Sequence, residues 1–235
     1  MKLLTITICL TIAVLVGSAG ASWSADLQKG LDAYQSRDYA TALREFKPLA
    51  DQGNATAQSM LGKMNEYGRG LPQDNEIAIK WYTLSAEQGN AEAQNNLGLM
   101  HQFGRSIPHN NEIAAKWYKL AANQEFADAQ YNLGLMYYTG KGVSFDRDIA
   151  YRLWRLAAEQ GDAASQLMLS AGHYSGQDIP QDYVKALMWA NIVSDSEPDR
   201  AFAFQHWTAE QMTPSQIAEA EKLARECISK NYKGC

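Results

Sequence analysis

Apolar residues recur along this chain at helical spacing, and the whole pattern returns every 36 residues. The stretch AQYNLGLMYYTGKG (129–142) has counterparts in AQNNLGLMHQFGRS (93–106) and AQSMLGKMNEYGRG (57–70). In the unit that begins at Ala127, the apolar spacing predicts one helix over 127–138 and a second over 148–159. A period of this length is typical of a protein built from stacked repeats.

Columns of similar residues run through the aligned units and predict which positions pack. The columns are Leu61, Leu97, Leu133 and Leu169; Gly62, Gly98, Gly134 and Ser170; and Ala42, Ala78, Ala114, Ala150 and Ala186. The small residues of the glycine column are expected to let helix backbones approach closely, while bulky columns fill the remaining space. Because no unit covers its own apolar faces, each one needs neighbours.

The link between the two helices of a unit carries stop and start signals. The glycines predicted to end the first helix in a left-handed conformation are Gly68, Gly104, Gly140 and Gly176. The residues predicted to cap the start of the second helix are Asp74, Asn110, Asp146 and Asp182. Glycine adopts the left-handed conformation that ends many helices, and a short acid or amide side chain satisfies free N–H groups at a helix start. The acids therefore have a structural role. The turn glycine and the full ligand set of a calcium loop are missing.

The repeated phrase AxAQxxLGxMYxxGxGV…D…A…W…AAEQG resembles the Sel-like repeat, a longer-looped relative of the tetratricopeptide repeat. The resemblance extends over about 25–194. It implies an all-α fold, an α-solenoid in which helix–turn–helix repeats of about 36 residues form a right-handed superhelix, with helical caps at both ends.

The resemblance also divides the chain. Residues 22–54 are expected to form a capping repeat of the shorter tetratricopeptide type, because Gly30 and Ala42 lie closer together than their counterparts in the next unit. Four Sel-like repeats follow over 55–196, and 197–235 is expected to form a C-terminal helical cap.

The C-terminal cap contains two helix starts and two cysteines. Ser196 is predicted to cap a helix that contains Pro198, and the sequence Thr213-Pro214-Ser215-Gln216 repeats the start signal before the last helix. Cys227 and Cys235 are expected to form a structural disulfide in an oxidising compartment. The alternative is two free thiols on a frayed terminus.

The first residues have the composition of a secretory signal. One lysine precedes an uncharged apolar run from Leu3 to Val16, and Ala19 and Ala21 follow in an A-x-A arrangement. We expect a signal peptide over 1–21 and a periplasmic or secreted mature protein with no membrane span. An uncleaved membrane anchor is the alternative.

Composition and motifs favour a protein without catalytic chemistry. A net charge of −5 with no basic stripe argues against nucleic-acid binding. The sequence contains no H-E-x-x-H, G-x-S-x-G or glycine-rich phosphate loop. His101 and His173 occupy a packing column, and His206 with Glu210 provides only two metal ligands. We expect no catalytic residues, no metal and no cofactor.

The resemblance assigns partner binding to one face of the first helix of each repeat. In tetratricopeptide arrays, positions two, five, nine and twelve of this helix line the concave groove. The residues at these positions are Glu92, Asn95, Leu99 and Gln102; Asp128, Tyr131, Leu135 and Tyr138; and Leu167 and Tyr174. Their mixture of aromatic, aliphatic and amide groups is typical of binding surfaces. Packing against neighbouring helices is the alternative, above all for Leu135 and Leu167.

These observations favour a monomeric adaptor of the bacterial envelope that holds a protein segment in the groove. The partner is expected to be another protein, such as a membrane sensor or an envelope component. One alternative is a hydrolase of cell-wall or β-lactam substrates, although its cysteine-rich relatives carry paired cysteines in each repeat, which this chain lacks. The other alternative is a purely structural or self-associating spacer.

Overall fold

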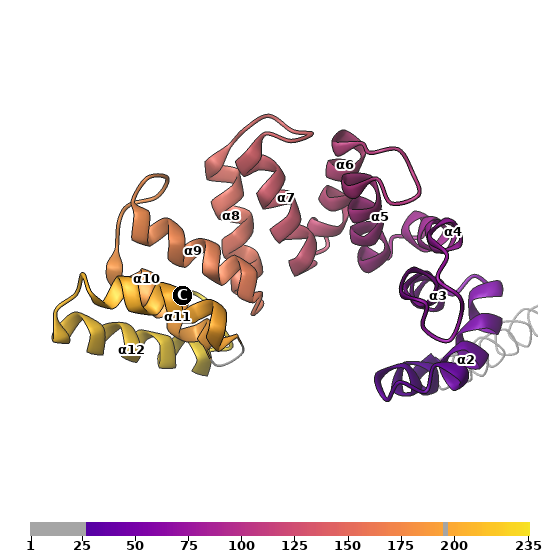
Figure 1. Ribbon diagram of the computed structural model, residues 1–235, viewed down its shortest axis with the longest axis horizontal. Coiled ribbons are helices and arrows are strands. Elements are labelled where there is room, and N and C mark those ends of the chain that lie inside the picture. Colours follow the sequence, from indigo (N-terminus) through magenta and orange to yellow (C-terminus); the bar gives the residue numbers. More distant parts are fainter. Residues whose placement is uncertain (1–26, 195–196) are drawn as a thin grey trace, which may run out of the picture. The chain divides into compact units, whose positions relative to one another are not determined.

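The computed structural model describes residues 27–194 and 197–235, and within these ranges every regular element is a helix (Figure 1). The predicted signal peptide over 1–21 lies outside the described residues. A first helix covers 27–35. The labelled helices are α2 (Tyr39–Asp51), α3 (Ala55–Tyr67), α4 (Asn75–Glu87), α5 (Ala91–Phe103), α6 (Asn111–Ala122), α7 (Ala127–Thr139), α8 (Arg147–Ala158), α9 (Ala163–Ser175), α10 (Tyr183–Ser194), α11 (Pro198–Ala209) and α12 (Pro214–Ser229).

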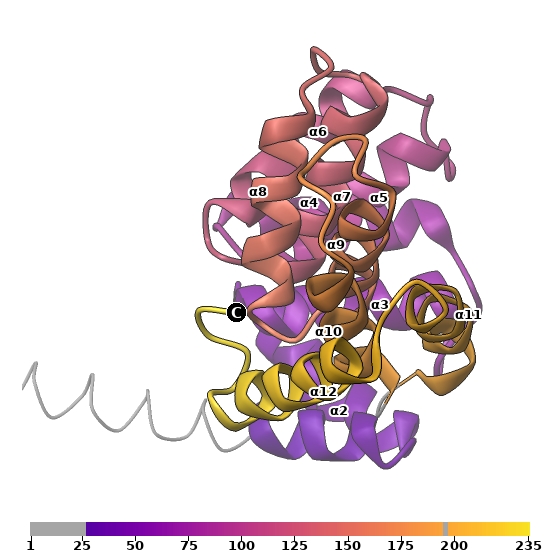
Figure 2. The same cartoon turned by 90° about the vertical axis from the view of Figure 1, so that its left-hand side faces the viewer.

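Consecutive helices pack against each other within two compact units. The first unit contains the residues up to 97 with 105–107, and the second contains 98–104 with 108–235. In each unit the helices are paired as the 36-residue pattern predicts, with α3 against α4, α7 against α8 and α9 against α10. Figure 2 shows α9 next to α10 in the second unit. The fold class is therefore an all-α solenoid, and this prediction is confirmed.

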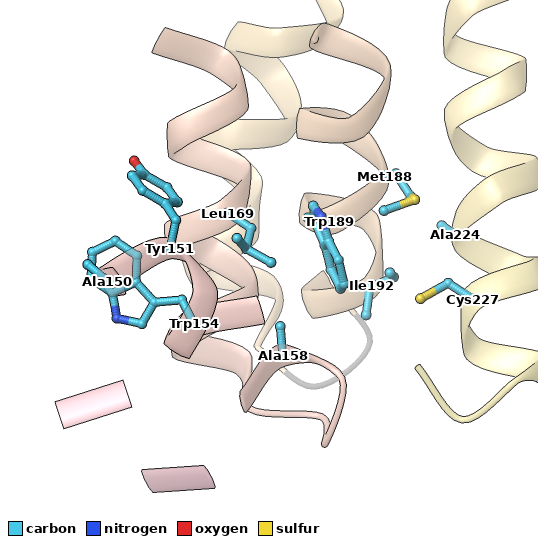
Figure 3. Packing of buried hydrophobic residues seen from close by; sticks show 10 residues of the cluster. All are labelled: Ala150, Tyr151, Trp154, Ala158, Leu169, Met188, Trp189, Ile192, Ala224 and Cys227. Atoms are coloured by element: carbon cyan, nitrogen blue, oxygen red, sulfur yellow. The ribbon is translucent and has the colours of Figure 1, made fainter. Parts of the chain in front are cut away.

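Each unit has its own apolar core. In the first unit Phe46, Leu61 and Met64 are almost completely buried. In the second unit Trp154 and Leu169 pack in one cluster that also contains Met188, Trp189, Ile192, Ala224 and Cys227 (Figure 3). The core of the second unit therefore includes residues of the C-terminal cap as well as of the repeats.

The predicted helix ends are confirmed. Gly68, Gly104, Gly140 and Gly176 have φ values of 64°, 63°, 67° and 65°. At the start of each second helix, the side chains of Asp74, Asn110, Asp146 and Asp182 accept hydrogen bonds from backbone N–H groups three residues ahead. Local chemistry is enough to fix these ends, because each cap acts on its own helical turn.

The glycine column works differently from the prediction. A Cβ atom on Gly62 or Gly98 would lie 2.5 Å from the ring of Tyr82 or Tyr118, and one on Gly134 would lie 2.5 Å from Nε1 of Trp154. An aromatic ring, rather than a helix backbone, therefore occupies the space that the glycine leaves. In the fourth repeat the pair is exchanged: Ser170 replaces the glycine, Ala190 replaces the aromatic residue, and the Ser170 hydroxyl donates to the carbonyl of Ala186 at 2.8 Å.

The C-terminal cap consists of α11 and α12, which both pack against α10. The prediction for Ser196 is not supported, since α11 begins at Pro198 with Glu197 at its N-cap and no side-chain cap bond; Ser196 itself lies outside the described residues. The predicted start of α12 is confirmed by a capping box between Thr213 and Gln216.

The structure joins Cys227 and Cys235 by a disulfide, with their Cα atoms 5.7 Å apart. Cys227 lies on α12, so the bond fixes the segment after this helix to the core of the second unit, against which Tyr232 and Cys235 also pack. None of the described helices has the length and apolar character that crossing a bilayer requires.

Candidate interaction surface

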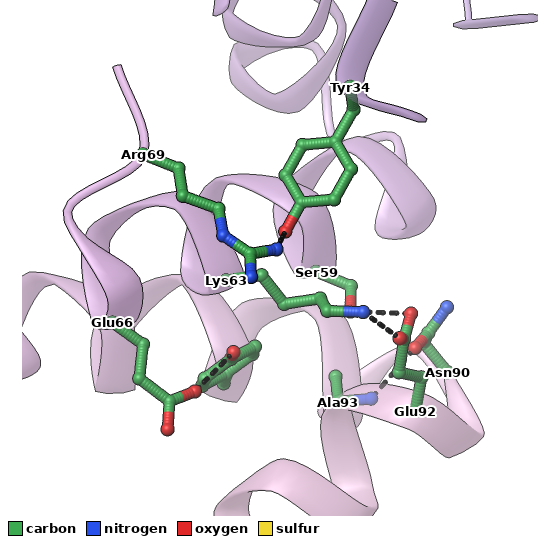
Figure 4. A network of polar contacts seen from close by, with 9 residues as sticks. Tyr34, Ser59, Lys63, Glu66, Arg69, Asn90, Glu92 and Ala93 are labelled. Atoms are coloured by element: carbon green, nitrogen blue, oxygen red, sulfur yellow. Dashed lines mark hydrogen bonds and ion pairs between the residues drawn. The ribbon is translucent and has the colours of Figure 1, made fainter. Parts of the chain in front are cut away.

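We call positions two, five, nine and twelve of the first helix of each repeat the helix-A face. In the first unit this face is polar (Figure 4). Lys63 Nζ forms an ion pair with Glu92 Oε1 at 2.6 Å, which connects α3 with the start of α5. The Ser59 hydroxyl donates to the other oxygen of Glu92 at 3.5 Å. Burial lowers the pKa of Lys63, but the hydrogen bond and charge of Glu92 outweigh burial and raise it overall.

A buried carboxylate ends this polar face. The Glu66 side chain is 7% exposed and forms an ion pair with Arg105, from the loop of the next repeat, at 2.9 Å. The hydroxyl of Tyr82 donates to Glu66 at 2.8 Å. Burial is the largest cause of the raised pKa of Tyr82, and the Glu66 charge adds to it. Arg69 donates to the hydroxyl of Tyr34 nearby, so charged groups in this region are already partnered.

The face residues of the first repeat were not predicted, because the predicted face began at Glu92. Ser59, Lys63 and Glu66 occupy positions five, nine and twelve of the preceding unit, so the 36-residue register was a sufficient signal. The ion pair of Lys63 with Glu92 could not be predicted from the register, because it depends on the distance between α3 and α5 in the folded chain.

In the second unit the helix-A face is aromatic and aliphatic. The side chains that remain half-exposed are Leu99, Gln102, Tyr131, Leu135, Tyr138 and Tyr174. Tyr131 and Leu135 lie on α7 and pack partly against the core cluster. Burial raises the pKa of Tyr131, with a smaller contribution from the charge of Asp162. Tyr131 and Leu135 therefore expose part of their apolar surface while the core cluster fixes the rest of each side chain.

Two of the predicted face residues also have internal partners. The Tyr138 hydroxyl donates to Asp178 Oδ2 at 3.0 Å, and Arg147 forms an ion pair with the same carboxylate, whose side chain is 3% exposed. The hydrogen bond to Asp178 is the main cause of the raised pKa of Tyr138. Gln102 Oε1 accepts a hydrogen bond from the Tyr118 hydroxyl at 2.6 Å.

Two further predicted residues do not lie on an open face. Asn95 is only 3% exposed. Leu167 is 7% exposed because it packs against Val193 and Ala201, with Phe204 beside them. The packing alternative therefore holds for Leu167, and the covering residues come from α10 and α11. Asp128 is exposed, and Glu92 is held by Lys63.

The C-terminal cap carries exposed aromatic residues that were not predicted from the sequence. On α11, Phe202 is 67% exposed and Trp207 is 50% exposed. Trp207 lies 36 residues after Ala171 and 72 after Leu135, so it continues position nine in register. The positive charge of Arg200, in the first turn of α11, lowers the pKa of Tyr131 on α7 and so partly offsets the effect of burial.

The histidines have packing roles or lie on the surface. Burial lowers the pKa of His173, whose Nδ1 lies 3.2 Å from the carbonyl oxygen of Pro180. Burial lowers the pKa of His101 as well. His206 and Glu210 form an exposed pair at 3.3 Å. Over 27–194 and 197–235, no three His, Cys, Asp or Glu side chains gather in a way that suits a metal ion.

The repeat geometry agrees with a known family. The Sel1 repeat model matches residues 55–90, 91–126, 127–162 and 163–192, which together make up more than half of the chain. The chain belongs to the Sel1 repeat family. Proteins built from Sel1 repeats generally serve as non-catalytic scaffolds for protein interactions, and the family gives no support to the hydrolase alternative. No curated protein matches the chain.

Solved structures of other Sel1 repeat proteins are similar to this one. The protective antigen c5321 of uropathogenic Escherichia coli, which displays an SLR fold, is 31% identical with a TM-score of 0.80, over 93% of this chain and 49% of the antigen. This Sel1 repeat protein thus spans about half the antigen's length. A Sel1 repeat protein from Oxalobacter formigenes is 28% identical with a TM-score of 0.68, over 87% of this chain and 85% of that one.

A more distant likeness concerns the fold alone. The immunity protein Pa5087 of Pseudomonas aeruginosa is 19% identical with a TM-score of 0.54, over 90% of this chain and 81% of that one.

Proposed function

We propose that this Sel1 repeat protein is a non-catalytic scaffold of the bacterial envelope that binds a segment of a partner protein on the helix-A face of its second unit. The observation that carries the proposal is a half-exposed group in which the core holds Tyr131 and Leu135. Tyr174 completes the group, and its ring lies 5.8 Å from the ring of Tyr183. Rigid aromatic and aliphatic side chains lose little conformational entropy on binding and dominate protein interfaces.

The two units differ in what they offer a partner. In the first unit, the charges of Lys63 and Glu92 satisfy each other, and a partner that separated them would have to replace that ion pair. In the second unit, the hydroxyl of Tyr131 has no hydrogen-bond partner among the described residues. A partner segment therefore gains both apolar contact and one hydrogen bond there.

An envelope location is part of the proposal. Its support is the charge and apolar pattern of residues 1–21 together with the disulfide between Cys227 and Cys235. Disulfides persist in the periplasm and outside the cell, whereas cytosolic thiols are kept reduced. The partner is accordingly a periplasmic, membrane-anchored or extracellular protein, and without it we expect the chain to be a monomer.

Site-specific photo-crosslinking in living cells tests the proposal. A benzophenone amino acid at Tyr131 or Leu135 should crosslink to one discrete partner. The same amino acid at Leu120 or Leu156, which are 48% and 50% exposed on α6 and α8, serves as the control. Crosslinks of equal yield from the control positions, or none from the helix-A face, would contradict the proposal.

A further inference from the structure

A second surface of this chain, separate from the helix-A face, is a pocket between neighbouring repeats. In the second unit it has a volume of about 620 Å³ and lies between α6, α7 and the loop that follows α7. Ala115, Leu133 and Val143 provide its apolar lining. Ala115 and Leu133 are each 5% exposed, so this lining is part of the rigid core. We call it the inter-repeat pocket.

The rim of the inter-repeat pocket carries positive charge. Lys116 and Lys119 of α6 both line it and are exposed, and neither forms an ion pair with another described residue. Glu112 also lines the pocket and forms no ion pair with another described residue. Tyr137 adds a half-buried phenol whose hydroxyl has no hydrogen-bond partner among the described residues.

The same position recurs 36 residues later, and there the chain itself covers it. Arg155, Leu169 and His173 replace Lys119, Leu133 and Tyr137 in register, and they line a space of only about 90 Å³ together with Trp189 and Cys235. The segment that ends in Cys235 is held in place by the disulfide to Cys227. This position in the repeat therefore receives a polypeptide segment within the same molecule.

Comparison with the equivalent residues of the first unit shows why the charge of Lys119 has no ion-pair partner. In the first unit the equivalent lysine, Lys47, contacts Asp51 at 2.5 Å and lies 5.6 Å from the centre of the Trp81 ring. The residue in register with Asp51 is Asn123, which carries no charge. Lys119 therefore has neither of the partners that hold Lys47, and it remains available to an anionic group from outside.

We propose that the inter-repeat pocket of the second unit binds a segment of a partner protein in which an acidic side chain neighbours a branched aliphatic or aromatic one. The apolar side chain enters between Leu133 and Val143, where it loses contact with water. The carboxylate pairs with Lys116 and Lys119, and the Tyr137 hydroxyl donates a hydrogen bond to it. This binding does not depend on the helix-A face.

Selection from a displayed random-peptide library, with the full chain as target, tests the proposal. The expected peptides share an acidic residue next to Leu, Ile, Phe or Tyr. Their affinity, measured by fluorescence anisotropy, should fall about tenfold or more in the Lys116→Ala/Lys119→Ala variant. Because both lysines are exposed, this variant should keep the wild-type unfolding midpoint.

The control is Lys80→Ala/Lys222→Ala, which removes the same charge from exposed positions elsewhere and should leave the affinity within twofold. Selected peptides that lack the acidic–apolar pair would overturn the proposal. So would affinity that falls in Tyr131→Ala but not in the double lysine variant, a result that would support the helix-A face instead. Binding of phosphatidylglycerol vesicles that requires both lysines, with no peptide enriched, would assign the pocket to lipid and also overturn it.

Discussion

At the scale of single residues, packing in this array depends on matched pairs from the two helices of a repeat. Where the first helix has glycine, the second has an aromatic ring against it, as with Gly98 and Tyr118. Where the first helix has Ser170, the second has Ala190. The ring fills the space that the glycine leaves, and where serine replaces the glycine the ring is replaced by a methyl group, so the two helices avoid the overlap that a close-packed interior does not allow.

This pairing predicts coupling between Gly134 and Trp154. Gly134→Ser alone should destabilise the fold by about 1–3 kcal/mol through overpacking, and Trp154→Ala alone by about 3–5 kcal/mol through a cavity. The double variant reproduces the pair of the fourth repeat, so its loss should be smaller than the sum by about 1 kcal/mol or more. Urea unfolding of the four proteins measures this, and strictly additive losses would refute the pairing.

The buried imidazole of His173 predicts that the stability of the fold depends on pH. Burial holds the pKa of His173 below its ordinary value of 6.5, so the unfolded chain takes up a proton more readily than the folded one. The stability that neutral His173 contributes is therefore complete above pH 6.5 and is lost as the pH falls below it.

His173→Asn should flatten the loss of stability between pH 6.5 and pH 5, because an amide side chain does not titrate in this range. Asn65 fills the equivalent position in the first repeat, so the variant should fold. Urea midpoints across this range measure the effect. His206→Asn, at an exposed position, is the control. Parallel pH profiles for wild type and His173→Asn would show that the buried imidazole does not set the dependence.

At the scale of elements, the helix ends were predictable from sequence and the cap packing was not. Asp74 and Gly68 act within one helical turn, so their residue types were sufficient. The burial of Leu167 depends on α11, which is not part of the regular pattern. The polar contact of Lys63 with Glu92 likewise joins two repeats. Local signals fix the elements, while contacts between elements require the distances of the folded chain.

The C-terminal element supports a prediction about the disulfide. The bond joins residues 8 apart in sequence, and closing a loop of that size in the unfolded chain corresponds to roughly 2–3 kcal/mol of stabilisation. Reduction should lower the free energy of unfolding by this amount and increase amide exchange over 230–235. Cys227→Ser/Cys235→Ser should show the lower stability without reductant. An unchanged exchange rate over the segment would mean that packing alone holds it.

At the scale of the whole molecule, the repeat register predicted the fold class. The candidate surface was assigned from the family resemblance, and neither the register nor the resemblance gave the accessibility of its side chains. Tyr131 and Leu135 remain half-exposed, whereas Asn95, at the position of Tyr131 in the preceding repeat, is buried. Side chains of one column thus differ in exposure because their neighbours differ. The aromatic residues of α11 were missed because the repeated sequence phrase does not recur after residue 194, although Trp207 keeps the spacing of position nine.

Our central claim is that a partner protein binds the helix-A face of the second unit, and one affinity measurement tests it most directly. The partner captured from Tyr131 is purified and titrated by calorimetry against wild type, Tyr131→Ala and Leu156→Ala. We expect Tyr131→Ala to weaken binding about tenfold or more, as for a buried interface aromatic, and Leu156→Ala to change it less than twofold. Equal affinities for wild type and Tyr131→Ala, with both proteins folded, would contradict the account.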